Sequence, residues 1–243
     1  MTIASPTPHD WLAPSHFIML GMIGLFGLAH SGLAALRLSA EKKIGPRPYR
    51  VLFALVSISL AIALITYFLN HRYDGVQLWQ LQGQPALEPL VWTLSAVSFI
   101  FLYPSTFNLL EIAAIQQPQV HLHNAGIIRV TRHPQMVGQV IWCVAHTLWI
   151  GTTFTLATSL GLIGYHLFAV WHGDRRLKVR YGAAFEAVQA QTSVLPFWAI
   201  LQGRQTLVLQ EFVRPAYAGI VAFVLLFWWL HPWMMSAAAN IRW

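Results

Sequence analysis

Six stretches of this 243-residue sequence are apolar over a length that crosses a lipid bilayer. A membrane-spanning helix needs about 20 mainly apolar residues. The candidate spans are residues 15–38, 48–70, 87–109, 134–150, 153–172 and 215–238. The fourth is short, so we expect it to be tilted or extended at one end. The sequence therefore predicts an all-α fold, a polytopic membrane helix bundle with about six transmembrane helices.

Composition excludes the main soluble classes. Only 9% of the residues are charged and 56% are hydrophobic, whereas soluble domains carry about 25% charged residues. The high apolar content also excludes a disordered chain. Cys143 is the only cysteine, which excludes an internal disulfide and a cysteine-based zinc site. No internal repeat or low-complexity tract divides the sequence, so we expect residues 1–243 to form one integral-membrane domain.

The positions of the basic residues predict the orientation of the chain. Thirteen of the 15 Lys and Arg residues lie in the connections that follow the first, third and fifth spans. Only Arg72 and Arg242 fall on the other side. Because positive residues are enriched in cytoplasmic loops, both termini are predicted to lie outside. The net charge of +7 is thereby explained by topology, without a nucleic-acid partner.

The long connection 173–214 is amphipathic. Its residues Leu177, Tyr181, Phe185 and Val188 recur at helical spacing. Such a segment is typical of a helix that lies in the plane of the membrane interface. We therefore expect an interfacial amphipathic segment between the fifth and sixth spans.

Few ligand-type side chains lie deep in the predicted spans, and an ionisable residue there is costly and usually functional. His30 lies about 12 Å and His146 about 18 Å from the basic side. Cys143 lies one helical turn before His146. Two such histidines could ligate one metal, for instance a haem iron. Alternatively, each could hydrogen-bond a neighbouring helix, and spacing alone leaves both interpretations open.

No pair of acids, Ser-His-Asp set or phosphate-binding glycine loop is visible in the sequence. Arg132 and His133 directly precede Pro134, which suits the first turn of a helix. At headgroup level they could contact a phosphate or a haem propionate. Arg37, at the matching end of the first span, is a further candidate for such a contact.

The sequence of residues 132–151 is a more specific indication of function than the spacing of the histidines. It reads RHPQMVGQVIWCVAHTLWIG and resembles the 15-cis-zeta-carotene isomerases of the NnrU-like membrane protein family. Shorter stretches also resemble that family: HSGLA at 30–34, HGDRRL at 172–177, TSVLPF at 192–197 and EFVR at 211–214. The resemblance runs from the first span to the end of the chain.

The resemblance implies a carotenoid cis-trans isomerase. The family converts 9,15,9'-tri-cis-zeta-carotene to 9,9'-di-cis-zeta-carotene at a haem b group that is active when its iron is reduced. Its haem-ligand histidines fall on His30 and His146, and its cysteine, which exchanges for a histidine in one redox state, falls on Cys143. A lipid-dissolved polyene suits a membrane bundle, and rotation about a double bond needs no carboxylate couple.

The resemblance also suggests partners and a location. Carotenoid desaturases are expected partners, because product passes between enzymes in one bilayer. The first ten residues, MTIASPTPHD, lack the features of a signal or transit peptide. We therefore expect the protein in the thylakoid or plasma membrane of a cyanobacterium.

Two other functions remain open from the sequence. A non-enzymatic membrane haem protein, an electron carrier or redox sensor, would share the same ligands. A membrane methyltransferase that uses S-adenosylmethionine is the other alternative, because Arg132-His133-Pro134 and the later segment 180–182 also resemble those enzymes. It would need acidic residues at its cofactor site, and the sequence offers mainly Asp174 and Glu186 there.

Overall fold

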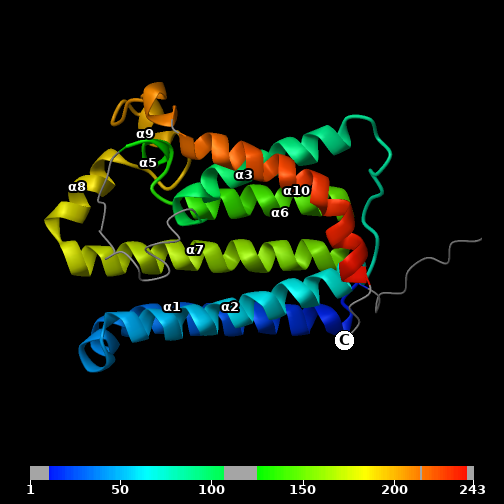
Figure 1. Ribbon diagram of the computed structural model, residues 1–243, viewed down its shortest axis with the longest axis horizontal. Coiled ribbons are helices and arrows are strands. Elements are labelled where there is room, and N and C mark those ends of the chain that lie inside the picture. Colours follow the sequence, from blue (N-terminus) through cyan, green and yellow to red (C-terminus); the bar gives the residue numbers. More distant parts are fainter. Residues whose placement is uncertain (1–10, 107–124, 214, 240–243) are drawn as a thin grey trace, which may run out of the picture.

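The computed structural model describes residues 11–106, 125–213 and 215–239, and this part of the chain is helical (Figure 1). One isolated bridge between Gln77 and Thr152 is its only β-type pairing. The main helices are α1 (Pro14–Ile44), α2 (Pro46–His71), α3 (Leu87–Thr106), α6 (Pro134–Ile150), α7 (Thr153–Tyr181) and α10 (Pro215–Ala239). The predicted all-α membrane bundle is confirmed.

Four helices of the described part are long and apolar enough to cross a membrane: α1, α2, α7 and residues Tyr217–Ala237 of α10. The other two predicted spans are shorter helices. α6 has 17 residues, or about 25 Å at 1.5 Å per residue. α3 is described to Thr106, so positions 107–109 of the third predicted span lie outside the described residues.

The fifth span was predicted to end at residue 172, and this boundary is wrong. α7 continues to Tyr181 through a run of basic residues. Arg and Lys are good helix formers, and Lys178 and Arg180 in the last turn complement the negative end of the helix dipole. The helix therefore projects beyond its apolar part, and the connection to α10 starts later than the hydropathy indicates.

The amphipathic segment is divided in two. Gly182, with φ of 51°, ends α7 and begins α8 (Ala183–Gln191). Phe185 is nevertheless buried, and Leu177, Tyr181 and Val188 are partly buried, so the predicted apolar face does turn inward. The short helices α5 (Ile127–Val130) and α9 (Trp198–Leu201) and the 3-10 helix η2 (Leu209–Phe212) complete this end of the bundle.

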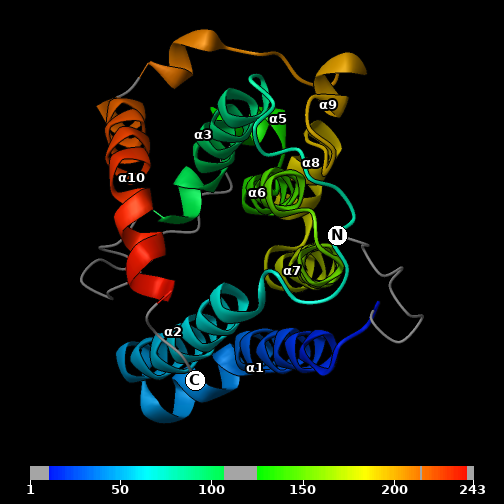
Figure 2. The same cartoon turned by 90° about the vertical axis from the view of Figure 1, so that its right-hand side faces the viewer.

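Helices α6 and α7 occupy the middle of the bundle (Figure 1). The α1–α2 pair packs on α7, α3 packs on α6, and α10 contacts α3 and α2 (Figure 2). One core cluster joins the α1–α2 pair to α6 and α7 and contains the buried side chains of Met19, Ile23, Leu64, Phe68, Ile150 and Phe154. A second joins α3, α5 and α6 and contains Phe101, Ile127, Val130, Met136 and Val137.

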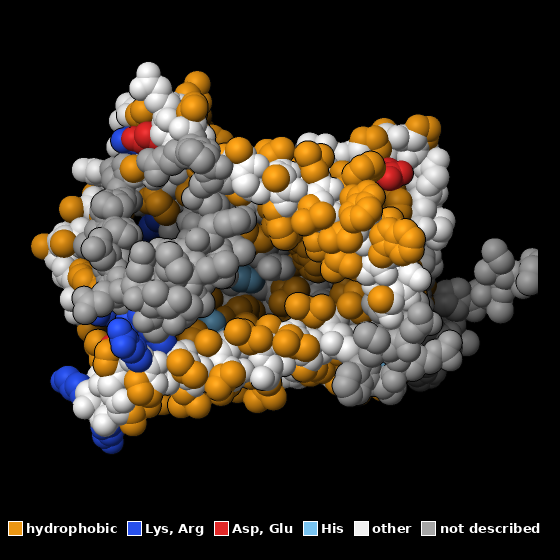
Figure 3. Space-filling model, viewed as in Figure 1, with side chains coloured by type: hydrophobic (Ala, Val, Ile, Leu, Met, Phe, Trp, Pro, Cys, Tyr) orange, Lys and Arg blue, Asp and Glu red, His pale blue; other side chains and the backbone are white. Residues whose placement is uncertain are grey.

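Basic and hydrophobic side chains occupy different parts of the outer surface. Lys and Arg side chains gather at the end that carries the α1–α2 turn, while the flanks of the helices are hydrophobic (Figure 3). Leu28 and Leu55, for example, are 77% and 61% exposed. A polar solvent would penalise such a surface, whereas hydrocarbon does not. The basic residues of different connections thus gather at one end, while the side of the membrane that this end faces stays a prediction.

Glycine at position 138 allows α3 and α6 to approach closely. A Cβ atom there would lie 2.7 Å from the carbonyl oxygen of Ser98 and 2.9 Å from Leu102. At this contact the Ser98 hydroxyl donates a hydrogen bond to the Gly138 carbonyl at 2.8 Å. Small residues are typical of such close membrane-helix contacts.

We expect Gly138→Ala to lower the stability of the bundle by about 2 kcal/mol, because the added methyl group overpacks the α3–α6 contact. Thermal unfolding in detergent, followed by circular dichroism, measures the change. Gly164→Ala is the matched control, because nothing lies within 4 Å of a Cβ at that helical position. Equal melting temperatures for the two variants would contradict this account of the contact.

Candidate functional site in the membrane interior

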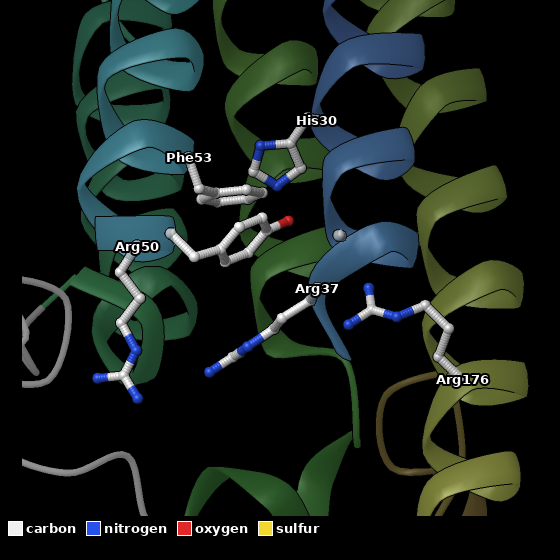
Figure 4. A pocket seen from close by; sticks show the side chains of 7 residues that line it. His30, Arg37, Arg50, Phe53 and Arg176 are labelled. Atoms are coloured by element: carbon white, nitrogen blue, oxygen red, sulfur yellow. The ribbon is translucent and has the colours of Figure 1, made fainter. Parts of the chain in front are cut away.

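A cavity of about 230 Å³ lies between α1, α2 and α7, with His30 on its wall (Figure 4). The residues that line it are His30, Ala34, Arg37, Tyr49, Arg50, Phe53 and Arg176. His30 and Arg37 are seven residues apart, so they share one face of α1 and differ in depth by about 10 Å. The cavity thus joins an imidazole inside the membrane to a cluster of arginines at the basic end.

The His30 ring is fixed by a neighbouring helix. Its Nδ1 atom lies 3.0 Å from the Ser57 hydroxyl oxygen of α2. Phe26 stacks on the ring at a centroid distance of 5.3 Å, and Phe53 lies at 4.8 Å. No described residue hydrogen-bonds to Nε2. A metal-binding histidine typically has its other ring nitrogen held in this way, so the arrangement leaves Nε2 suited to a ligand role.

His146 on α6 has the same property. Its Nδ1 atom lies 3.0 Å from the Trp142 carbonyl oxygen one turn earlier. Since a carbonyl only accepts, Nδ1 carries the hydrogen, and in the neutral ring Nε2 is then the acceptor. The Trp142 ring stacks on the imidazole at 3.7 Å. His231 of α10 is close enough to interact with His146 electrostatically.

The two histidines are not in contact, and their depths follow from their neighbours on α7. Gly27 of α1 packs against Tyr165, and Thr147 of α6 hydrogen-bonds Ser159 at 2.7 Å. By this register His30 lies about eight residues, or about 12 Å, closer to the basic end than His146. The His30 ring points toward Phe53 and the arginine end of its own cavity (Figure 4).

A hollow opens on one flank of the molecule. In Figure 3 it lies between the side formed by α3 and α10 and the side formed by α1 and α2, and histidine side chains are visible inside it. The α10 window that could span a membrane is only 6% buried within the bundle. The hollow therefore faces the region that lipid occupies.

Cys143 is completely buried. Its Sγ atom lies 3.7 Å from the Gln139 amide nitrogen, and its carbonyl oxygen accepts a weak hydrogen bond from Ser159 at 3.5 Å. Within the described ranges no three His, Cys, Asp or Glu residues are grouped closely enough to hold a metal ion. The structure thus does not gather His30, His146 and Cys143 around one point.

A haem group is nevertheless compatible with the residues present. The donors are imidazoles with one nitrogen already held and the other available. The cavity beside His30 has aromatic walls and a cationic edge, which match the two parts of a porphyrin, an apolar plane and a pair of propionates. The predicted haem contact Arg37 lies in this same cavity.

Arg132 and His133 are placed differently. Both bind the Asp174 carboxylate of α7, each at 2.8 Å, and all three side chains are less than 20% exposed. They anchor the start of α6 to α7, and their predicted cofactor contact stays a prediction. Nearby, Arg129 pairs with Glu211 at 2.8 Å, and this hydrogen bonding raises the pKa of the arginine.

The sequence interpretation missed two cavity residues, Arg50 and Arg176. They were counted only as signals of orientation. A usable clue was the Gly45-Pro46 turn, because a tight turn between two antiparallel helices places the start of the second beside the end of the first. Arg50 is thereby brought to the same end as Arg37. Arg176 became part of the site only because α7 continues beyond residue 172.

The model of the family described as NnrU protein matches residues 18–239, which is most of the chain. The chain belongs to the NnrU family. Two curated relatives are named 15-cis-zeta-carotene isomerase, chloroplastic. The one from Arabidopsis thaliana is 55% identical over 228 residues, and the one from Zea mays is 53% identical over 229 residues.

The matched regions cover 93% of this NnrU chain but only 62% and 63% of the two relatives. The chain thus spans somewhat under two thirds of their length. All residues of the His30 cavity, together with Cys143 and His146, lie inside the part that the NnrU model matches. No solved structure matches the chain.

We expect Asp174→Asn to destabilise this NnrU protein by about 2 kcal/mol, because it leaves Arg132 and His133 partly buried without their counter-charge. Glu186→Gln is the control. Its pair with Lys178 is more than half exposed on both sides, so the loss there should be below about 0.5 kcal/mol. Chemical denaturation in detergent micelles provides the comparison, and a milder effect for Asp174→Asn than for Glu186→Gln would refute the anchoring role.

Proposed function

We propose that the chain isomerises a carotenoid within the membrane, converting 9,15,9'-tri-cis-zeta-carotene to 9,9'-di-cis-zeta-carotene. One observation carries the proposal: identity of 55% and 53%, over 93% of the chain, to two proteins named 15-cis-zeta-carotene isomerase. His30, Cys143 and His146 lie within residues 18–239, the part of the chain that the NnrU model matches.

The hollow supports a long apolar substrate. It opens toward lipid between two helix pairs (Figure 3), and a carotenoid is dissolved in lipid. Aromatic side chains lie beside both histidines: Phe26 and Phe53 beside His30, and Trp142 beside His146. Flat aromatic faces suit contact with a flat polyene.

The distribution of acids also supports an isomerisation without proton transfer. The described acidic side chains lie near helix ends or in connections, namely Glu41, Asp74, Glu88, Asp174, Glu186 and Glu211. The part of the chain that the structure describes thus offers no carboxylate couple between His30 and His146 to act as general acid and base. Rotation about a carbon–carbon double bond requires a temporary loss of bond order and no such couple.

We further propose that the chain uses haem b, with His30 and His146 as iron ligands and Cys143 as an exchangeable one. When bound, haem would supply a redox-active iron that can lower the bond order of a neighbouring polyene. The Trp142 carbonyl would hold His146 in the tautomer that presents Nε2, and Ser57 would fix the orientation of the His30 ring. The aromatic side chains around them would exclude water from the reacting bond.

The methyltransferase alternative is weaker in this geometry. It relies on acidic residues after the helix pair to bind its cofactor. Asp174 is instead engaged by Arg132, His133 and Gln189. Glu186 pairs with Lys178 on the surface. A non-enzymatic haem protein shares every ligand with the isomerase, so the substrate assay separates those two.

Location and partners follow as proposals from the same function. The four long apolar helices support a chain and a substrate that share one membrane. The two relatives are chloroplastic, while placement in the thylakoid or plasma membrane of a cyanobacterium remains a prediction for this chain. Carotenoid desaturases remain the proposed neighbours that supply substrate and receive product.

We expect the purified protein to show a haem Soret band that shifts on dithionite reduction, and to isomerise the tri-cis substrate only when reduced. His30→Ala and His146→Ala should each lower activity by about 100-fold or more and alter the Soret band, because an axial ligand is lost. Spectroscopy and chromatographic separation of the zeta-carotene isomers provide the two readouts.

His71→Ala is the matched control, since His71 pairs with Asp74 at the opposite end of α2 from the arginine cluster. It should retain both signals. Full haem content with unchanged substrate in the wild type would identify a haem protein that is not an isomerase. A colourless protein that nevertheless isomerises the substrate would refute the haem part alone.

A further inference from the structure

Among the described residues, carboxylates balance only part of the positive charge of the His30 cavity. Of the three guanidinium groups on its wall, Arg37 pairs with Glu41 at 2.7 Å. For Arg50 and Arg176, no carboxylate among the described residues lies within ion-pair distance. The Arg50 Nε atom is moreover buried, and no described atom accepts its hydrogen bond. Burying a cationic donor without a partner is costly, so the cluster is suited to an anion from outside the protein.

The arginines lie at one edge of the cavity and the imidazole lies at the other (Figure 4). His30 and Arg37 are separated by two helical turns, or about 10 Å. The Phe53 ring lies between them, and Tyr49 lines the same cavity. The Tyr49 hydroxyl donates to the Leu33 carbonyl, so it is already engaged within the protein. A ligand that fills this cavity needs an apolar body and an anionic edge.

Guanidinium groups favour carboxylates, because two parallel N–H donors match two carboxylate oxygens. Arg50 comes from α2 and Arg176 from α7, on different walls of the cavity. Groups on separate walls can bind two anionic arms of one ligand. A pair of carboxylates attached to one edge of a flat macrocycle fits that arrangement.

We propose that Arg50 and Arg176, together with Arg37, bind the two propionate carboxylates of a porphyrin whose metal faces His30. This inference rests on the proposed haem function and extends it to residues that were not assigned before. It orients the macrocycle with its propionates toward the basic end of the bundle. Arg50 and Arg176 are therefore cofactor-binding residues, and the anionic edge of the cofactor balances their charge.

The test compares two porphyrins that differ only in charge. Protohaem carries free propionates, and its dimethyl ester carries none. Each is titrated into haem-free protein in detergent, and the Soret band gives the dissociation constant. The proteins are the wild type, Arg50→Gln, Arg176→Gln, the double variant and Arg47→Gln. The last is the matched control, because Arg47 lies one turn before Arg50 on α2 and is exposed.

We expect each single substitution at 50 or 176 to weaken protohaem binding by about tenfold, as the loss of a charged hydrogen bond does. The ester should bind the wild type about 100-fold more weakly than protohaem does. The double variant should bind the ester no more weakly than the wild type does. Arg47→Gln should leave both constants unchanged.

Three results would overturn the inference. Equal protohaem affinity in the wild type and the double variant would show that the arginines bind no propionate. An equal loss for the ester and for protohaem would show a structural role. The third result is measured in phosphatidylcholine nanodiscs. Suppose that added phosphatidylglycerol weakens protohaem binding to the wild type but not to the double variant, and that both proteins bind protohaem equally well without it. A lipid phosphate, rather than a propionate, then occupies the arginine site.

The same titrations separate this inference from the proposed function. If the wild type binds protohaem and the arginine variants bind it equally well, the haem function stands and only the propionate assignment fails. If the wild type binds neither porphyrin, both fail together. Circular dichroism of every variant confirms that a weakened constant does not report unfolding.

Discussion

The bilayer interior penalises every polar group that lacks a partner, and the rest of this structure depends on that constraint. Backbone groups satisfy it by forming helices. Side chains satisfy it by bonding across helices, as Ser98 does with Gly138 and Thr147 with Ser159. A polar atom without a partner inside the membrane raises the free energy of the folded protein, so such an atom usually marks a functional site or binds a ligand. His30, His146 and Arg50 are of this kind, and they define the candidate site.

The bundle also divides its polar chemistry between its two ends. At the basic end, ion pairs hold short helices and connections to the core: Arg132 and His133 to Asp174, and Arg129 to Glu211. At the other end, hydroxyl groups serve instead, with Thr152 donating to the Arg72 carbonyl and His16 bonded to Thr153. The charged end is therefore the one at which an anionic ligand can be held.

Hydropathy was sufficient to predict the apolar helices, because it depends on averages over about 20 residues, while the orientation predicted from charge stays a prediction. Such averages do not predict where a helix ends when its end depends on a single backbone position. Gly182 ends α7 with a positive φ, so the last helical residue, Tyr181, lies nine residues after the predicted end. α7 thereby carries Arg176 into the cavity. The histidines could be identified individually because a deep imidazole is costly. Their difference in depth depends on the packing of α1 and α6 on α7, which no short motif encodes.

The hollow opens sideways, in the plane of the membrane, rather than toward either aqueous face. A substrate that arrives by this route reaches the protein from the lipid, so its concentration in water does not determine how fast it binds. Its effective concentration is its mole fraction among the surrounding lipids or detergent molecules. For the proposed carotenoid substrate, adding more detergent at a fixed amount of carotenoid should then slow turnover by surface dilution alone. Rates for such a protein are comparable only at a stated ratio of substrate to amphiphile.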